Sequence, residues 1–164
     1  MSKEKNMSYK DLTAEQLTVE QLGFIDDMAT LMVPWGMTTA VARLYGYLLL
    51  QDEPISLDRI CQQLDISKST ASVAARQLEV SKLVRRHSER GSKRASYSIV
   101  EGGMAAIEAH AAMLGNLAAL MQNNINTADN QVASQRLQKT SQVCFAMQEV
   151  MQQGFQNINK VWNA

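Results

Sequence analysis

The chain has 164 residues and no net charge, and 46% of its residues are hydrophobic, which suits one compact domain or a small domain with helical extensions. The first residues lack the apolar run of a secretion signal, and we expect no segment to approach the roughly 18 apolar residues of a membrane span, so we place the protein in the cytoplasm, away from membranes. Cys61 and Cys144 lack zinc-site spacing, so we expect buried thiols, no disulfide framework, no metal and no cofactor.

The N-terminal part is predicted to be a polar tail, residues 1–17, followed by two scaffold and dimerisation helices within residues 18–55. Thr18 and Gln21 have the spacing of a capping box, and the helix that follows should end at Pro34. Thr38 or Thr39 can cap the second helix. Its apolar stripe is predicted to consist of Val41, Leu44, Tyr45, Leu48 and Leu49.

Residues 56–101 have the pattern of a helix-turn-helix followed by a β-hairpin. Ser56 can cap a short helix, and three residues separate that helix from a second one that begins at Lys68. Alternating apolar and polar residues predict one strand before Gly91 and another from Ala95 onward. Together these elements predict a winged helix-turn-helix, in which the hairpin is the wing.

The positive charge of the chain is concentrated in the same region. Eight lysines and arginines lie between Ile66 and Ala95 against two glutamates, a surplus of six that the rest of the chain must balance. A charge cluster is usually a solvated face, but this one coincides with the motif. We therefore predict that it faces the phosphates of double-stranded DNA.

The second helix of the motif is predicted to contact the major groove. Small residues such as Ala71 and Ala75 would pack inward, while Val73 and Arg76 on the opposite face could touch a thymine methyl and a guanine. Serine and threonine hydroxyls would bond phosphates or base edges, and Lys68 would bind the backbone at the helix N-terminus. The predicted contacts on this helix and its cap are Ser67, Lys68, Ser69, Thr70, Ser72, Val73 and Arg76.

The wing is predicted to hold the flanking DNA backbone. Arg90, Lys93 and Arg94 can lie along phosphates or enter a narrow minor groove, and Gly91 permits the tight turn between the strands. Arg85 and Arg86 should point to opposite faces of their strand, so only one should face DNA, and we assign Arg86.

Residues 102–164 are predicted to form two long helices of a dimerisation region. Ile107, Leu114 and Met121 recur every seven residues, and a polar stretch over residues 123–130 breaks the run. The apolar stripe of the last helix is longer than one neighbouring helix can cover. A second copy of the chain would cover the rest, and a purely intramolecular hairpin is the alternative. The stripe consists of Leu137, Cys144, Met147, Met151, Phe155, Ile158 and Trp162.

Three motifs, "LYGYLLL", "ISKST" and "GSKRASY", give the region of about residues 37–103 its resemblance to the winged helix of the MarR superfamily, most closely its GbsR-like branch. The sequence departs from the family pattern at Asp65 and Ser81, where glycine is common. The resemblance implies a mainly α (α+β) fold with N- and C-terminal dimerisation helices. It also implies a homodimeric transcriptional regulator with a small-molecule effector, associated in this branch with osmoprotectant genes.

Four aromatic residues lie close together in the sequence where the first two helices should meet: Phe24, Trp35, Tyr45 and Tyr47. Aromatic faces bind quaternary ammonium groups by cation–π attraction. We therefore name these four residues as a candidate effector pocket for betaine or choline. Ordinary core packing is the alternative interpretation.

The function predicted from the sequence is sequence-specific DNA binding by a homodimeric transcriptional regulator. Repression is favoured over activation, because a dimer on a promoter blocks polymerase without further contacts. The sequence contains no nucleophile triad, phosphate-binding glycine loop or catalytic carboxylate pair, so we do not expect an enzyme. A winged-helix protein-interaction module is the alternative; a DNA-compacting protein should carry far more positive charge.

Overall fold

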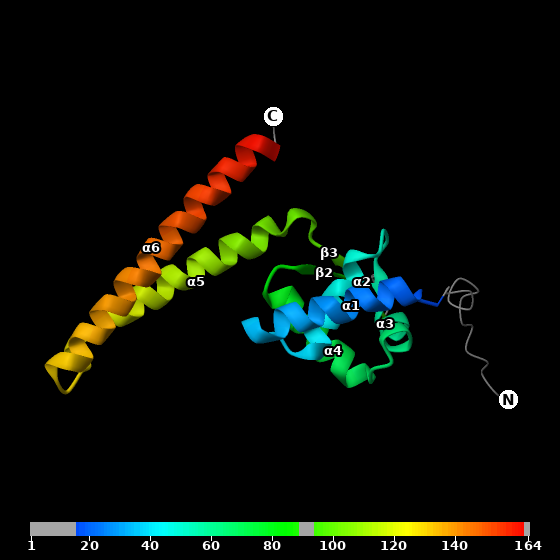
Figure 1. Ribbon diagram of the computed structural model, residues 1–164, viewed down its shortest axis with the longest axis horizontal. Helices are drawn as coiled ribbons and strands as arrows, with labels where there is room; N and C mark the ends of the chain where they lie inside the picture. Colours follow the sequence, from blue (N-terminus) through cyan, green and yellow to red (C-terminus); the bar gives the residue numbers. More distant parts are fainter. Residues whose placement is uncertain (1–15, 89–93, 163–164) are drawn as a thin grey trace. The chain divides into compact units, whose positions relative to one another are not determined.

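The computed structural model describes residues 16–88 and 94–162. It divides into two compact units, which meet in the sequence between Val100 and Glu101 and are described separately here. The first contains four helices and a small sheet among its described residues, and the second contains two long helices (Figure 1).

Unit 1 begins with two helices whose ends follow the expected capping signals. In α1 (Val19–Met32), the side chains of Thr18 and Gln21 each accept a hydrogen bond from the other's backbone N–H, which confirms the capping box. The helix passes into the short 3₁₀ turn η2 (Val33–Trp35), which contains Pro34. Thr38, and not Thr39, caps α2 (Thr39–Leu49).

The helix-turn-helix consists of α3 (Leu57–Leu64) and α4 (Lys68–Val80), capped by Ser56 and Ser67. Asp65 ends α3 in the left-handed region at φ 51°, a conformation that favours glycine and that aspartate tolerates better than most residues. At the end of α4, Ser81 keeps a negative φ, and Lys82 takes the left-handed place at φ 59°. Residues other than glycine therefore occupy the left-handed position in both turns.

The sheet has three antiparallel strands in the order β1, β3, β2. The hairpin is formed by β2 (Val84–Ser88) and β3 (Ala95–Ile99), where Arg86 pairs with Tyr97. The strand β1 (Ile55–Ser56) was not expected, because two residues are too few to show alternation. Its Ile55 also pairs with Tyr97, so β3 lies in the middle.

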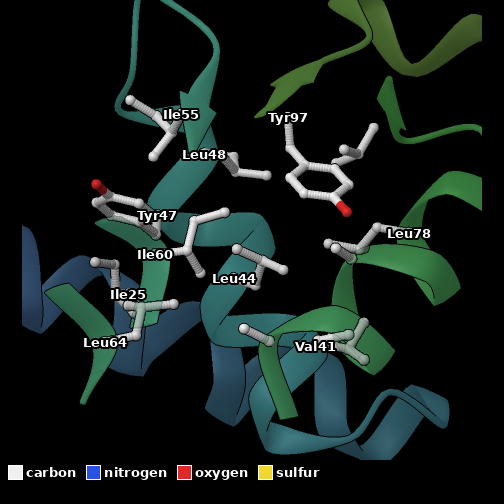
Figure 2. Packing of buried hydrophobic residues seen from close by; sticks show 14 residues of the cluster. Ile25, Val41, Leu44, Tyr47, Leu48, Ile55, Ile60, Leu64, Leu78 and Tyr97 are labelled. Atoms are coloured by element: carbon white, nitrogen blue, oxygen red, sulfur yellow. The ribbon is translucent and has the colours of Figure 1, made fainter. Parts of the chain in front are cut away.

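The core of unit 1 is formed where the four helices and the sheet meet (Figure 2). Ile25, Leu44, Ile60 and Leu78 come from α1, α2, α3 and α4 in turn, and each has no exposed surface. The predicted stripe of α2 is wrong at its end, because Leu49 is 42% exposed and Tyr47 is 1% exposed. Tyr47 lies three residues after Leu44 and shares its face, whereas Leu49 lies five residues after it.

Unit 2 is an antiparallel pair of helices, α5 (Met104–Asn123) and α6 (Gln131–Trp162), with the 3₁₀ turns η3 (Glu101–Gly103) before them and η4 (Ile125–Thr127) between them. The two helices run side by side (Figure 1). Small residues form the interface, among them the buried Ala111, Ala118, Ser141 and Cys144. Larger apolar side chains contribute as well, because the half-buried Ile107, Met151 and Phe155 line a pocket that residues of both helices form.

One apolar segment was not expected from the sequence. The stretch Glu101–Asn123, which includes α5, is long and apolar enough to cross a membrane by length and composition. Our expectation that no segment approaches this length is therefore wrong, because α5 carries a single charged residue, Glu108. One such helix is weak evidence for a membrane protein, since core helices of soluble proteins pass the same test.

Candidate DNA interface

The face of α4 that packs on α2 and α3 is built from small residues and one leucine. Ala71, Ala74, Ala75 and Leu78 are each at most 1% exposed. The opposite face is free: Val73 is 54% exposed, and Arg76 is exposed beside it. The helix is thus held tightly on one side and presents a continuous open face on the other.

Gln77 and Val80, which were not among the predicted contacts, extend this open face. Both are exposed, and they line a surface groove of about 400 Å³ together with Val73 and Arg76 and with residues of the start of α2. They lie four and seven residues after Val73, so helical spacing from Val73 identifies both.

A cluster of hydroxyl groups marks the N-terminus of α4. The Oγ of Ser67 accepts from the backbone N–H of Thr70 at 3.1 Å and lies 2.8 Å from the hydroxyl oxygens of Ser69 and Thr70. All three residues are exposed, and Ser72 is half-buried. Free N–H groups of a first helical turn together with hydroxyl donors form a favourable position for a phosphate.

Lys68 is held in an ion pair within the motif. Its Nζ lies 2.7 Å from Oδ1 of Asp58 in the first turn of α3, and both side chains are about two-thirds exposed. The hydrogen bond and the charge of Asp58 raise the pKa of Lys68 above its ordinary value. Lys68 therefore stays charged at neutral pH, and a phosphate would have to compete with Asp58 for it.

The arginines of β2 are both exposed, so burial does not distinguish Arg86 from Arg85. Tyr97, which is paired with Arg86, is 5% exposed and belongs to the core. The hairpin is also joined by His87 and Ser98, whose Nε2 and Oγ lie 2.8 Å apart. Arg94 is exposed just before β3, whereas Arg90, Gly91 and Lys93 lie outside the described residues.

The four aromatic residues named for an effector differ widely in their surroundings. Trp35 is 90% exposed in η2, Phe24 is 39% exposed, and Tyr47 is 1% exposed within the core. Tyr45 is half-buried, and burial raises the pKa of its hydroxyl. An aromatic cage needs several faces around one space, and this distribution does not favour one.

The two thiols fit a structural role. Cys144 is buried at the helix interface of unit 2, and Cys61 is half-buried on α3. Burial raises the pKa of the Cys61 thiol, and the charge of Asp58 raises it further, so little reactive thiolate forms at neutral pH. Within the ranges that the structure describes, no group of three or more His, Cys, Asp or Glu side chains could hold a metal ion.

A capped helix with an open polar face, a preceding short helix and a following hairpin are thus present in one unit. Residues 35–95 match the model of the MarR family. This region therefore resembles the winged helix of the MarR family. Outside it the match ends, and no curated protein sequence matches the chain significantly.

One solved structure shares the fold of this chain, and others are similar to a lesser degree. A structure described as that of a transcriptional regulator is similar with a TM-score of 0.77 and 19% identity, over 86% of this chain and 99% of that one. S. aureus MepR in its DNA-binding conformation has 16% identity and a TM-score of 0.41, over 86% of this chain and 99% of that one. Lactococcus lactis ZitR, a zinc-responsive MarR family member, has 16% identity and a TM-score of 0.35, over 77% of this chain and 76% of that one. The first likeness establishes the fold.

Proposed function

We propose that the protein is a MarR-type transcriptional regulator that binds double-stranded DNA at specific sequences through α4. One observation carries this proposal: α4 buries its small-residue face and leaves hydroxyl groups, Val73 and Arg76 together on the open one. Such a face offers hydrogen-bond donors for phosphates and one guanidinium for a guanine. It has the parts that a recognition helix needs.

Each part of the face has a separate role in the proposal. The hydroxyl cluster at Ser67, Ser69 and Thr70 fixes the helix on the phosphate backbone, which sets its register. Arg76, two turns further along α4, forms the base contact that supplies selectivity. Arg86, Arg90, Lys93 and Arg94 bind the flanking backbone from the wing and contribute affinity at any sequence.

We also propose that the protein acts as a homodimer through unit 2. Large apolar side chains remain open on both of its helices: Met113, Leu117 and Leu120 on α5, and Val143, Phe145, Met147 and Val150 on α6, each at least 42% exposed. Side chains of this kind are typical of a surface that another subunit covers. A two-fold dimer would bind two half-sites about 34–36 Å apart or a multiple of that distance.

Repression by occupation of a promoter and control by a small effector complete the proposal. The resemblance to the GbsR-like branch makes choline and glycine betaine the first osmoprotectants to test. A loss of operator binding on adding either compound would support that assignment.

The test is selection of genomic fragments by the purified full chain, followed by binding of the best fragment across a salt series beside a scrambled fragment. The proposal predicts a palindromic fragment that is preferred at least a thousandfold, as specific DNA-binding proteins show. Equal and steeply salt-dependent binding of both fragments would leave only a basic surface and contradict it. Negligible binding of both would instead favour a protein-interaction module, for which the exposed Val73 and Val80 would be the contact residues.

A further inference from the structure

A second polar site lies in unit 1 away from the open face of α4. It is a pocket of about 260 Å³ between the start of α1, the end of α2 and α3, and we call it the Arg59 pocket. Thr18, Gln21, Tyr47, Arg59 and Gln63 supply polar lining, and none of the lining residues is acidic. Among the lining residues that the structure describes, the charged group is therefore the guanidinium of Arg59.

Within the described part of the chain, two atoms of this wall are buried and have no hydrogen-bond partner: Oη of Tyr47 and Nε of Arg59. Tyr47 itself is 1% exposed. Figure 2 shows its ring within the apolar cluster, with the hydroxyl group at the edge of the cluster and directed away from it. The ring thus has a packing role that the hydroxyl group does not share.

The two side chains are close neighbours, but no hydrogen bond of good geometry joins them. Burial raises the pKa of Tyr47, and this effect outweighs the charge of Arg59 and the approach of its guanidinium as a hydrogen-bond donor, both of which lower that pKa. Tyr47 therefore keeps its proton at neutral pH and can donate it in a hydrogen bond. The O–H of Tyr47 and the Nε–H of Arg59 are therefore two neighbouring hydrogen-bond donors without acceptors.

Buried donors without acceptors destabilise a fold. A ligand that accepts hydrogen bonds from both the Tyr47 hydroxyl and Nε of Arg59 would remove this cost, so its binding would be favoured. A guanidinium with an adjacent O–H fits a group that carries two or more oxygens and a negative charge. The N-terminal end of α1 in the same wall also favours an anion. Since the volume is below the roughly 300–1,000 Å³ of pockets for drug-sized ligands, the occupant must have few heavy atoms.

We propose that the Arg59 pocket binds a small oxyanion, a carboxylate or a phosphate, through Arg59 and Tyr47. A quaternary ammonium ion does not fit, because Arg59 would repel it. Since Arg59 and Gln63 lie on α3, against which α4 packs, a bound anion contacts the first helix of the DNA-binding motif. Any effect on DNA binding rests on the function proposed above, but the binding of the anion does not.

The test measures the melting temperature of the full chain without DNA at constant ionic strength, with chloride replaced by acetate or by inorganic phosphate. We expect at least one of the two to raise the melting temperature with saturation, and choline chloride to leave it unchanged. Comparison of acetate with phosphate identifies which oxyanion the pocket prefers. No saturable rise with either anion would overturn the proposal.

Variants assign the effect to the pocket. Arg59→Gln should abolish the rise, and Tyr47→Phe, which keeps the ring in the core, should weaken anion binding about tenfold. Arg136→Gln on α6 and Tyr45→Phe on α2 are matched controls and should respond as the wild type does. An undiminished rise in Tyr47→Phe would overturn the proposal even if Arg59→Gln failed to fold.

Discussion

Replacement of Asp58 by asparagine should strengthen DNA binding, because the carboxylate of Asp58 holds Lys68 at 2.7 Å beside the N-terminus of α4. The change removes one negative charge from the interface and leaves Lys68 free for a phosphate. Both side chains are about two-thirds exposed, so the loss of the pair should leave the stability of the fold nearly unchanged.

The magnitude follows from the number of phosphates that the protein neutralises. One additional contact steepens the dependence of log K on log salt by about 0.9. Between roughly 50 and 200 mM salt, this change increases the loss of affinity about three- to fourfold beyond that of the wild type. Fluorescence anisotropy with labelled duplexes across that range measures the slope directly.

Two variants complete the test. Asp58→Asn combined with Lys68→Gln should return the salt slope to the wild-type value or below it. Asp26→Asn is the matched control, because it also removes a carboxylate from an ion pair, and it should leave the salt slope unchanged. Asp26 on α1 lies 2.9 Å from Nε of Arg43 on α2, although the N–H of that atom does not point at the carboxylate. An unchanged slope or weaker binding in Asp58→Asn would show that Lys68 does not contact phosphate.

Three further results are expected. Leu44→Ala should lower the free energy of unfolding by about 2–5 kcal/mol in urea denaturation, whereas Leu49→Ala, at a site 42% exposed, should change it far less; similar losses would contradict the packing of α2. Ser67→Ala should destabilise the fold by about 0.5–2 kcal/mol through loss of the α4 cap, seen by thermal melting, and an unchanged melting temperature would refute the cap. Cys61 should react slowly with iodoacetamide at neutral pH and faster as the pH rises through its raised pKa, and Asp58→Asn should accelerate the reaction at pH 8. The reaction is measured in Cys144→Ser, where Cys61 is the remaining thiol, and alkylation at neutral pH as fast as that of free cysteine would contradict the prediction.

The local signals of the sequence located the helix-turn-helix well, because each of its helices begins at a residue with a side-chain cap. Ser56 and Ser67 each accept a hydrogen bond from a backbone N–H of the following turn, as Thr18 does at the start of α1. Helical spacing also separated the buried alanines of α4 from its open face. These features depend on residues within one turn of each other, which a sequence displays directly.

Features that depend on tertiary contacts were not visible in the sequence. The two-residue strand β1 exists because Ile55 pairs with Tyr97, 42 positions further along the chain. The ion pair of Lys68 with Asp58 depends on how the turn at Asp65 folds back, and the Arg59 pocket needs residues from three helices. The grouping of four aromatic residues is visible in the sequence, whereas the unpaired donors at Tyr47 and Arg59 are visible only in the folded chain.

The central claim is that Arg76 on the open face of α4 gives the protein its sequence selectivity. The decisive measurement compares dissociation constants for the selected fragment and its scrambled version in the wild type, Arg76→Ala and Arg136→Ala. The account predicts that Arg76→Ala lowers the preference by about five- to 150-fold, with a small loss of affinity for the scrambled fragment, and that Arg136→Ala keeps the wild-type preference. An unchanged preference in Arg76→Ala, or an equal loss on both fragments, would contradict it.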